Sequence, residues 1–353
     1  MPTFNIFDIN RFSTELESAK KTVIVTHFKP DGDAMGSSIG MYSFIKRFFS
    51  TDVRIVLNDR YPASLAFMVS PEIEKDILTY DDNKEEVLQA ISDADHIIAL
   101  DFNAFHRTDR LESVLASSDA FKILIDHHLH PDTASFDMVF SIQEISSASE
   151  LEYHILKAMP QCQGKPENIP FAAAEALMTG MTTDTNNFSN STYPSTLQMA
   201  SELIETGVDR DRIIFNIYNQ YGENRLRLLG HMLKDLLKIT DDGVAYVVLD
   251  KETLERYSIE EGDTEGFVNM PLSIGKVGMS ILAKEDKDRI RISIRSKKGI
   301  SANRCSRFHF NGGGHENAAG GRLSIPEDIP DITHASEYIE KHTHIFINEE
   351  NEA

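Results

Sequence analysis

The sequence Ile123-Leu124-Ile125-Asp126-His127-His128 constrains the fold of this chain more than any other stretch. Three consecutive apolar residues, two of them β-branched, are typical of a buried strand. An acid and two histidines follow at the point where the backbone would leave a sheet. Ligands of open α/β sheets bind at the carboxyl ends of the strands. This stretch is consistent with a ligand site at the strand end. A strand end followed by ordinary polar loop residues, with no ligand site, explains the same residues equally well.

Similar strands precede this one along the chain. β-Branched and apolar runs predict strands at about 22–26, 54–58 and 96–100, with helices at about 34–49 and 83–92 between them. Strands and helices that alternate with short connections predict an α/β fold with a doubly wound, mostly parallel sheet. Apolar periodicity then predicts further helices at about 8–20, 146–159, 169–181, 195–206 and 210–219.

The pattern changes near residue 240. Three more strands are expected, at 244–249, 277–282 and 290–295. The last alternates apolar and polar residues with period two, which indicates one buried and one open face. A smaller α+β domain therefore follows the first. We expect a first domain over residues 1–205, a helical connector over 206–239 that includes a long amphipathic helix at 223–239, and a second domain over 240–348.

Composition restricts the class of protein. The 35 basic and 56 acidic residues give a net charge of −21, which disfavours binding of duplex nucleic acid over the whole surface. Cys162 and Cys305 are too far apart for a metal-binding spacing and are expected to be reduced thiols. We see neither a signal peptide nor a run of ~18 apolar residues. We expect a cytoplasmic protein that does not bind membranes.

Residues of metal-ligand type follow several of the predicted strands. A single acid at a strand end is usually structural, but several converging acids would repel one another unless cations compensate them. Four carboxylates carry a total charge of −4, and two divalent cations would balance it. Two neutral imidazoles would serve as further ligands. Oxygen and nitrogen ligands without thiolate favour Mn²⁺, with Mg²⁺ as the alternative. The candidate ligands are His27, Asp31, Asp33, Asp101, His127 and Asp184.

At these residues the sequence resembles the DHH phosphoesterases, with a second domain that resembles the DHHA1 module. The matching positions occur in the expected order over nearly the whole chain. The most similar branch is that of the bacterial bifunctional oligoribonuclease/PAP phosphatases, or nanoRNases. The resemblance rests on His27 to Ser37, Asp101, Asp126-His127-His128 and Asp184 in the first domain, and on Arg295-Ser296, Gly312-Gly313-Gly314-His315 and Ala318-Ala319-Gly320 in the second.

The resemblance implies a role for each residue of the first domain. It implies that Asp101 bridges two metals and that Asp184 completes the ligand set. Asp126 would orient an imidazole, and His128 would lie beside the scissile phosphate as a donor or proton relay. Asn186 and Asn190 depart from the residues common in relatives, which bears on substrate detail. The remaining ligands would divide into His27 with Asp31 at one metal and Asp33 with His127 at the other.

The second domain has its own signs of phosphate binding. Three consecutive glycines let backbone amides approach an anion closely. The segment 284–307 holds nine basic and three acidic residues, a local excess of six positive charges. Arg295 is the member best suited to a bidentate phosphate contact. The expected substrate-binding residues are Arg295, Ser296, Asn303, Gly312, Gly313, Gly314 and His315.

These features predict a two-metal phosphoesterase whose substrate lies in a crevice between the domains. Expected substrates are short oligoribonucleotides, linear dinucleotides such as pApA, and 3′-phosphoadenosine 5′-phosphate. The alternatives are a RecJ-like single-strand exonuclease, an exopolyphosphatase, and a nucleotide-binding sensor without turnover. The glycine-rich module argues against inorganic pyrophosphatase chemistry. A homodimer and a monomer both remain open.

Overall fold

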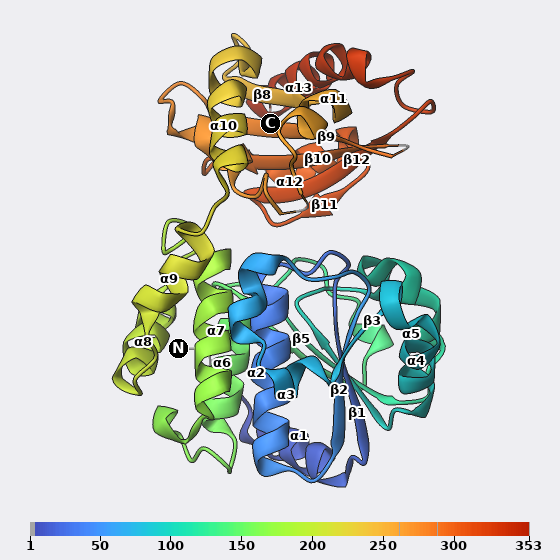
Figure 1. Cartoon of the computed structure of the whole chain (residues 1–353), viewed down its shortest axis with the longest axis vertical. Helices are drawn as coiled ribbons and strands as arrows, with labels where there is room; N and C mark the ends of the chain where they lie inside the picture. The colour runs from blue at the N-terminus through green and yellow to red at the C-terminus, as the bar shows by residue number, and fades with distance from the viewer. Residues whose placement is uncertain (1–3, 261, 288, 353) are drawn as a thin grey trace. The chain divides into compact units, whose positions relative to one another are not determined.

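The computed structural model describes residues 4–260, 262–287 and 289–352. The chain divides into two compact units, Met1–Gln220 and Tyr221–Ala353 (Figure 1). The boundary lies inside the segment 206–239 that we expected to connect the domains. Each unit has its own sheet and its own hydrophobic core. The two units are therefore described separately.

The sheet of the first unit has six parallel strands in the order β3-β2-β1-β4-β5-β6. This order confirms the predicted doubly wound α/β fold. Two of the strands were missed in the sequence because they are short and lie at the edges, where few apolar residues are needed. The bounds are β1 Lys21–Thr26, β2 Asp52–Leu57, β3 Ile77–Thr79, β4 His96–Leu100, β5 Phe121–Asp126 and β6 Met138–Ser141.

Helices cover both faces of this sheet (Figure 1). One core cluster joins α1, α2, α6 and α7 to the sheet, and a second joins α4 and α5 to its other face. The predicted helices are confirmed with end shifts of a few residues. The bounds are α1 Ile6–Ser18, α2 Gly32–Phe48, α3 Pro71–Glu74, α4 Tyr80–Asp93, α5 Glu112–Ser117, α6 Ala148–Ala158, α7 Phe171–Asp184, α8 Pro194–Glu205 and α9 Arg210–Tyr218.

Helices α2 and α7 pack closely because glycines face each other at their contact. A Cβ atom on Gly36 would lie 2.6 Å from the carbonyl oxygen of Ala176 and 2.8 Å from the Cα of Gly180. Both atoms belong to the backbone and cannot move aside as a flexible side chain would. The absence of a side chain at Gly36 thus sets the distance between two helices that carry site residues.

The second unit has a mixed sheet in the order β11-β12-β10-β9-β8-β7. Helices α12 and α13 form its main core with this sheet, and α10 packs in a second cluster. The expected helix 223–239 was wrong at its end, because the helical segment stops at Leu236 and a strand follows. The bounds are α10 Glu223–His231, a π-helical turn Met232–Leu236, β7 Lys238–Ile239, β8 Val244–Leu249, α11 Lys251–Arg256, β9 Met279–Asp286, β10 Arg289–Ser296, α12 Ala302–His309, β11 Gly313–Gly314, β12 Ala318–Ser324 and α13 Ala335–Glu352.

Strand β10 alternates half-buried and buried residues along its whole length, as the period-two pattern predicted. Its isoleucines enter the core with α12 and α13, so its arginines lie on the other face. Neither helix nor strand was predicted for the segments that form α12, β11, β12 and α13. Within the described part of the chain, no helix has both the length and the apolar character that a membrane span requires.

We expect Gly36→Ala to destabilise the first unit by about 1–3 kcal/mol, because the added methyl group forces α2 and α7 apart. Gly230→Ala is the matched control, since a Cβ atom at this helical glycine meets nothing within 4 Å. The control should leave stability unchanged or raise it by up to ~1 kcal/mol. Denaturant unfolding monitored by circular dichroism measures both effects. Equal stability of the two variants would contradict the packing argument.

Candidate metal centre

The predicted metal ligands of the first unit meet at one edge of its sheet. Strands β1, β4 and β5 are neighbours, and their carboxyl ends carry His27, Asp101 and the Asp126-His127-His128 triplet. The N-terminus of α2 adds Asp31 and Asp33. Asp184 is the last residue of α7, three residues beyond the helix end predicted from the sequence. Parallel strand order therefore brings together residues that lie up to 157 positions apart.

Asp101 lies at the centre of this cluster and faces two imidazoles with its two oxygens. Its Oδ2 is 3.5 Å from Nε2 of His27, and its Oδ1 is 3.4 Å from Nε2 of His127. Asp101 adopts φ 61°, an uncommon conformation for a residue other than glycine. Three groups with metal-ligand spacing share this residue: His27, Asp31 and Asp101; Asp33, Asp101 and His127; and Asp101, Asp126 and His128.

Helix N-termini fix the carboxylates that flank Asp101. The amides of Ala148 and Ser149, at the start of α6, donate to Oδ2 and Oδ1 of Asp33 at 2.7 and 3.0 Å. Asp31 caps α2 and accepts from the amides of Asp33 and Ala34. The positive end of a helix dipole thus supports negative charge at each position. Asp184 Oδ2 lies 3.7 Å from Nε2 of His127, and Asp184 is half-buried, whereas Asp31 is the more exposed carboxylate.

The two histidines of the triplet have different partners. Nδ1 of His128 lies 2.7 Å from Oδ1 of the fully buried Asp126, whose Oδ2 also accepts from the His128 amide. The imidazole that Asp126 orients is thus His128. In the neutral ring this bond places the proton on Nδ1 and leaves Nε2 as the acceptor. His27 is oriented in a similar way, because its Nδ1 lies 2.8 Å from the carbonyl oxygen of Phe28.

The buried carboxylates of the cluster need positive charge nearby to compensate them. Burial acts to lower the pKa of His27 and His127, but hydrogen bonds to Asp101 and the surrounding carboxylates raise the pKa values to about 9 and about 10. Burial raises the pKa of Asp33 well above its usual value, and the charges of Asp101 and Asp184 add to the effect. Burial also opposes the charge of Asp101, yet bonds from His127 and His27 lower its pKa well below the usual value.

This set of donors fits divalent cations. In the absence of a metal, protonated imidazoles balance the buried carboxylates. A bound cation would supply that charge instead and leave the imidazoles as neutral nitrogen ligands. The donor atoms are carboxylate oxygens and imidazole nitrogens, and both cysteines are buried elsewhere. Such a set suits Mg²⁺ or Mn²⁺ better than a structural zinc site.

The predicted substrate-binding residues of the second unit surround its glycine-rich turn. Asn303 on α12 donates to the carbonyl oxygen of Gly314. The hydroxyl of Ser296 donates to the carbonyl oxygen of Ile300 at 2.6 Å and accepts from Asn317. Ser296 and Asn303 therefore hold loops in place. Arg295, at the end of β10, is half-buried, and His315 follows the turn directly.

Two of the three glycines, Gly312 and Gly314, are required by close backbone approach. A Cβ atom on Gly312 would collide with the carbonyl oxygen of Gly320 and lie 2.5 Å from Gly321. Gly314 adopts φ 148°, and a Cβ atom there would lie 2.6 Å from the carbonyl oxygen of Ala318. The amides of Gly312 and His315 donate to carbonyl oxygens of the protein. An anion at this turn would therefore have to be bound by other donors than these two amides.

The start of α6 contains a buried carboxylate that is not among the predicted site residues. Glu150 accepts from the amide and hydroxyl of Ser146 and from the hydroxyl of Thr196 at 2.7 Å. Ser147, three residues earlier, caps the helix and accepts from the Glu150 amide. The order Ser-x-x-Glu before an apolar run is a helix-start pattern and could have revealed this anchor. Glu150 thus fixes the helix end that orients Asp33.

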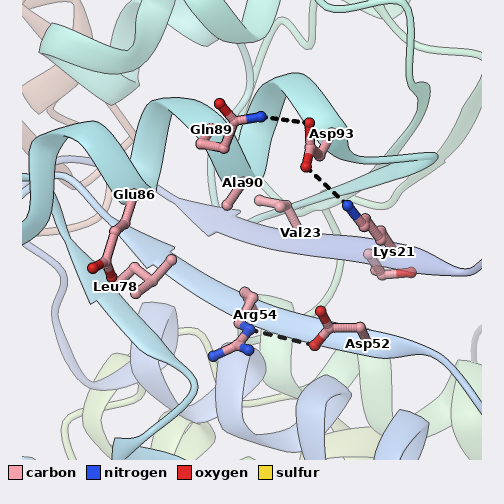
Figure 2. Close-up of a pocket in the computed structure, with 10 residues that line it drawn as sticks. Lys21, Val23, Asp52, Arg54, Leu78, Glu86, Gln89, Ala90 and Asp93 are labelled. Atoms are coloured by element: carbon pink, nitrogen blue, oxygen red, sulfur yellow. Dashed lines mark hydrogen bonds and ion pairs between the residues drawn. The ribbon is translucent and has the colours of Figure 1, made fainter.

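A shallow pocket lies at the opposite ends of the strands (Figure 2). Lys21 begins β1 and Asp52 begins β2, and Lys21 pairs with Asp93 of α4 at 2.8 Å. The cavity measures about 250 Å³. It is thus separated from the metal cluster by the length of the strands. None of the predicted site residues lines it.

The geometry of the cluster agrees with the comparisons with known families. Residues 21–181 match the model of the DHH family, N-terminal domain, and residues 241–341 match the DHHA1 domain. The chain belongs to the DHH family. It is a metal-dependent phosphoesterase with a DHHA1 domain. Its family membership confirms the resemblance drawn from the motifs.

Several relatives match nearly the whole chain. The bifunctional oligoribonuclease and PAP phosphatase NrnA of Bacillus subtilis is 26% identical over 85% of this chain and 88% of that protein. NrnA of Thermus thermophilus is 27% identical over 85% and 83%. A crystal structure of an exopolyphosphatase-related protein from Bacteroides fragilis is 37% identical, covers 99% of both chains and has a TM-score of 0.89.

The buried Glu150 predicts an acid-dependent loss of stability. Burial opposes its charge, but the His154 imidazole at 3.6 Å and hydrogen bonds from Ser146 and Thr196 outweigh this and lower the pKa to about 2. Because the folded pKa lies below the ordinary value of 4.5, the contribution is complete above that value and lost as the pH falls toward 2. Glu150→Gln should therefore be about 1–3 kcal/mol less stable at pH 7.

The difference between wild type and Glu150→Gln should narrow as the pH falls from 6 to 3. Urea unfolding at each pH measures it. The exposed Glu205 on α8 provides the control substitution Glu205→Gln. If the difference in unfolding free energy between wild type and Glu150→Gln stayed constant from pH 6 to 3, the ionised form of Glu150 would not be the source of the stabilisation.

Proposed function

We propose that this phosphoesterase hydrolyses short oligoribonucleotides, linear dinucleotides such as pApA, and 3′-phosphoadenosine 5′-phosphate, with two Mn²⁺ ions as cofactors and Mg²⁺ as the alternative. The observation that carries the proposal is Asp101, whose two oxygens face two separate sets of ligands. The names of the relatives that match over most of their length support the substrate class. We further propose that the protein acts in the cytoplasm.

Each metal would be held by its own pair of residues and by the shared Asp101. His27 with Asp31 would hold one ion, and Asp33 with His127 the other, with Asp184 as a further ligand near His127. Bound in this way, the ions supply an activated water and neutralise the charge of the phosphoryl oxygens. Four aspartates against two divalent cations leave the ligand set neutral before an anionic substrate arrives.

The residues of the chain itself would orient and move a proton. Asp126 fixes the His128 ring through Nδ1, so that Nε2 is available to a phosphate oxygen or a leaving group. A ring that carries a proton on both nitrogens can donate from Nε2 to that oxygen. His128 would thus act as the donor to the scissile phosphate. Asp126 would act through it as a positioning residue.

The DHHA1 domain would bind the terminal phosphate of the substrate. Arg295 offers a charged fork at the end of β10, and His315 offers a ring nitrogen beside the Gly312–Gly314 turn. Asn303 and Ser296 hold the backbone on which these groups lie. A domain that binds one end of an oligonucleotide favours short substrates. The strongly acidic protein surface agrees with small ligands over long polyanions.

Exopolyphosphatase activity is the second candidate. It is favoured by the 37% identical relative from Bacteroides fragilis that is described as exopolyphosphatase-related. Polyphosphate presents a terminal phosphate without a nucleobase, and the same metal centre could hydrolyse it. The substrate panel must therefore contain both classes.

Purified protein with Mn²⁺ should release AMP from pApA and from di- to pentanucleotides, and phosphate from 3′-phosphoadenosine 5′-phosphate. Asp101→Asn should lower kcat by at least about 10³-fold on each, because both ligand sets lose their shared carboxylate. Chromatography of the products measures turnover. The variant Asp93→Asn, at the pocket far from the metal centre, serves as control. Hydrolysis confined to polyphosphate would favour the second candidate, and tight nucleotide binding without any product would indicate a sensor.

The different partners of His127 and His128 predict different losses. His127→Ala should lose bound metal, because Nε2 lies among Asp33, Asp101 and Asp184. His128→Ala should retain metal and lose kcat by roughly 10²–10⁴-fold, as expected for removal of a proton donor. Elemental analysis of the dialysed variants and steady-state kinetics separate the two effects. Equal metal content in both variants would contradict this division.

A further inference from the structure

The peptide group between Phe28 and Lys29 links the His27 imidazole to a carboxylate outside the metal cluster. The carbonyl oxygen of Phe28 lies 2.8 Å from Nδ1 of His27. Because a carbonyl oxygen can only accept, this contact places the proton on Nδ1 and leaves Nε2 as the ligand atom. The Lys29 amide, which belongs to the same peptide group, donates to Oδ2 of Asp59 at 2.8 Å. Asp59, one peptide group and the imidazole thus form a continuous chain of hydrogen bonds.

The backbone at this peptide group has an uncommon conformation and is held from two sides. Lys29 adopts φ 53°, in the left-handed region that few residues other than glycine occupy. The Phe28 amide donates to the carbonyl oxygen of Arg107 at 2.8 Å, in the turn that follows β4. Two consecutive amides are therefore fixed by two different elements. The segment that carries His27 and Asp31 is positioned by residues outside the cluster.

Asp59 is itself fixed just after the carboxyl end of β2. Its Oδ2 also accepts from the side-chain amide of Asn58 at 2.7 Å, and Asn58 is fully buried. Arg110 donates from Nε to Oδ1 of Asn58 at 3.2 Å and from Nη2 to the Asn58 carbonyl oxygen. The same guanidinium pairs with Asp81 at the start of α4, and its Nη2 lies 3.4 Å from Oδ1 of Asp59. Asp59 is therefore held in one orientation, unlike a solvated surface acid.

The other set of metal ligands has a different support. Asp33 accepts directly from two backbone amides at the start of α6. The bonds of Asp59 and Arg110 described above lead to the set that contains His27 and not to Asp33. A change at Asp59 should therefore affect one of the two sets and spare the other.

We propose that Asp59 is a positioning residue for one of the two metal ions, and that it acts through the Phe28–Lys29 peptide group and the His27 ring. Metal-bound histidines usually donate their second ring nitrogen to a carboxylate or a carbonyl oxygen, which fixes the orientation of the ring. Here a peptide group lies between the carboxylate and the imidazole. The inference rests on the proposed function, because it takes His27 and Asp31 as ligands of one ion.

The variant Asp59→Ala tests this role through the binding of Mn²⁺ alone. A titration followed by the electron paramagnetic resonance signal of free Mn²⁺ counts the sites and gives a dissociation constant for each. We expect one constant to rise by about 10–100-fold, as is typical when an outer partner of a metal ligand is lost, and the other to stay unchanged. The kcat for pApA at saturating Mn²⁺ should return close to the wild-type value. Hydrogen exchange of the Lys29 amide in the metal-free protein should become faster.

Two further variants separate this effect from a general loss of charge or fold. Asp59→Asn keeps a side-chain oxygen that can accept from the Lys29 amide, and should bind Mn²⁺ more tightly than Asp59→Ala. Asp82→Ala removes a carboxylate that pairs with the exposed Arg60, and should leave both dissociation constants unchanged. Thermal unfolding of each variant checks that the first unit remains folded.

Several results would overturn the inference. They are unchanged Mn²⁺ binding in Asp59→Ala, an equal loss at both metal sites, an equal loss in Asp82→Ala, Asp59→Asn binding no tighter than Asp59→Ala, or unchanged exchange of the Lys29 amide. Failure of the proposed function would look different, because a wild type that binds two Mn²⁺ ions but hydrolyses none of the nucleotides would leave the comparison of metal binding intact. A wild type that binds no Mn²⁺ would overturn both.

Discussion

The structure of the first unit depends on one electrostatic constraint, the convergence of carboxylates at one edge of a parallel sheet. Asp33 and Asp101 are almost fully buried beside His127, in surroundings that disfavour charge. Such a cluster is tolerable only with compensating positive charge. Helix N-termini, imidazoles and bound cations are the available sources. The first two are visible in the structure, and the donor atoms suit the third.

The surrounding fold serves to hold this cluster in place. The backbone of α6 orients Asp33, and Glu150 in turn holds the start of α6 through its bonds to Ser146 and Thr196. The glycine contact between α2 and α7 brings these two helices close together. Asp33 of α2 and Asp184 of α7 can therefore both lie in the cluster. A metal site needs ligand positions accurate to a fraction of an ångström. Close helix packing and a buried carboxylate anchor are two ways to achieve this.

The sequence was sufficient to predict the parts of the fold that depend on local patterns. Long buried strands and amphipathic helices gave the parallel sheet, and polar residues at the strand ends marked the candidate ligands. The short edge strands β3 and β6, and the glycine strand β11, lack such a pattern. The end of α7 at Asp184 and the anchor at Glu150 depend on tertiary contacts.

In the proposed function, the first unit would cleave the substrate and the second would select it. The first unit gathers buried carboxylates that suit cations, whereas the segment 284–307 of the second carries an excess of six positive charges. A metal centre that is neutral once filled has little power to distinguish one phosphodiester from another. Discrimination by length then has to come from contacts away from the reacting phosphate, and a sheet face offers such contacts at regular intervals.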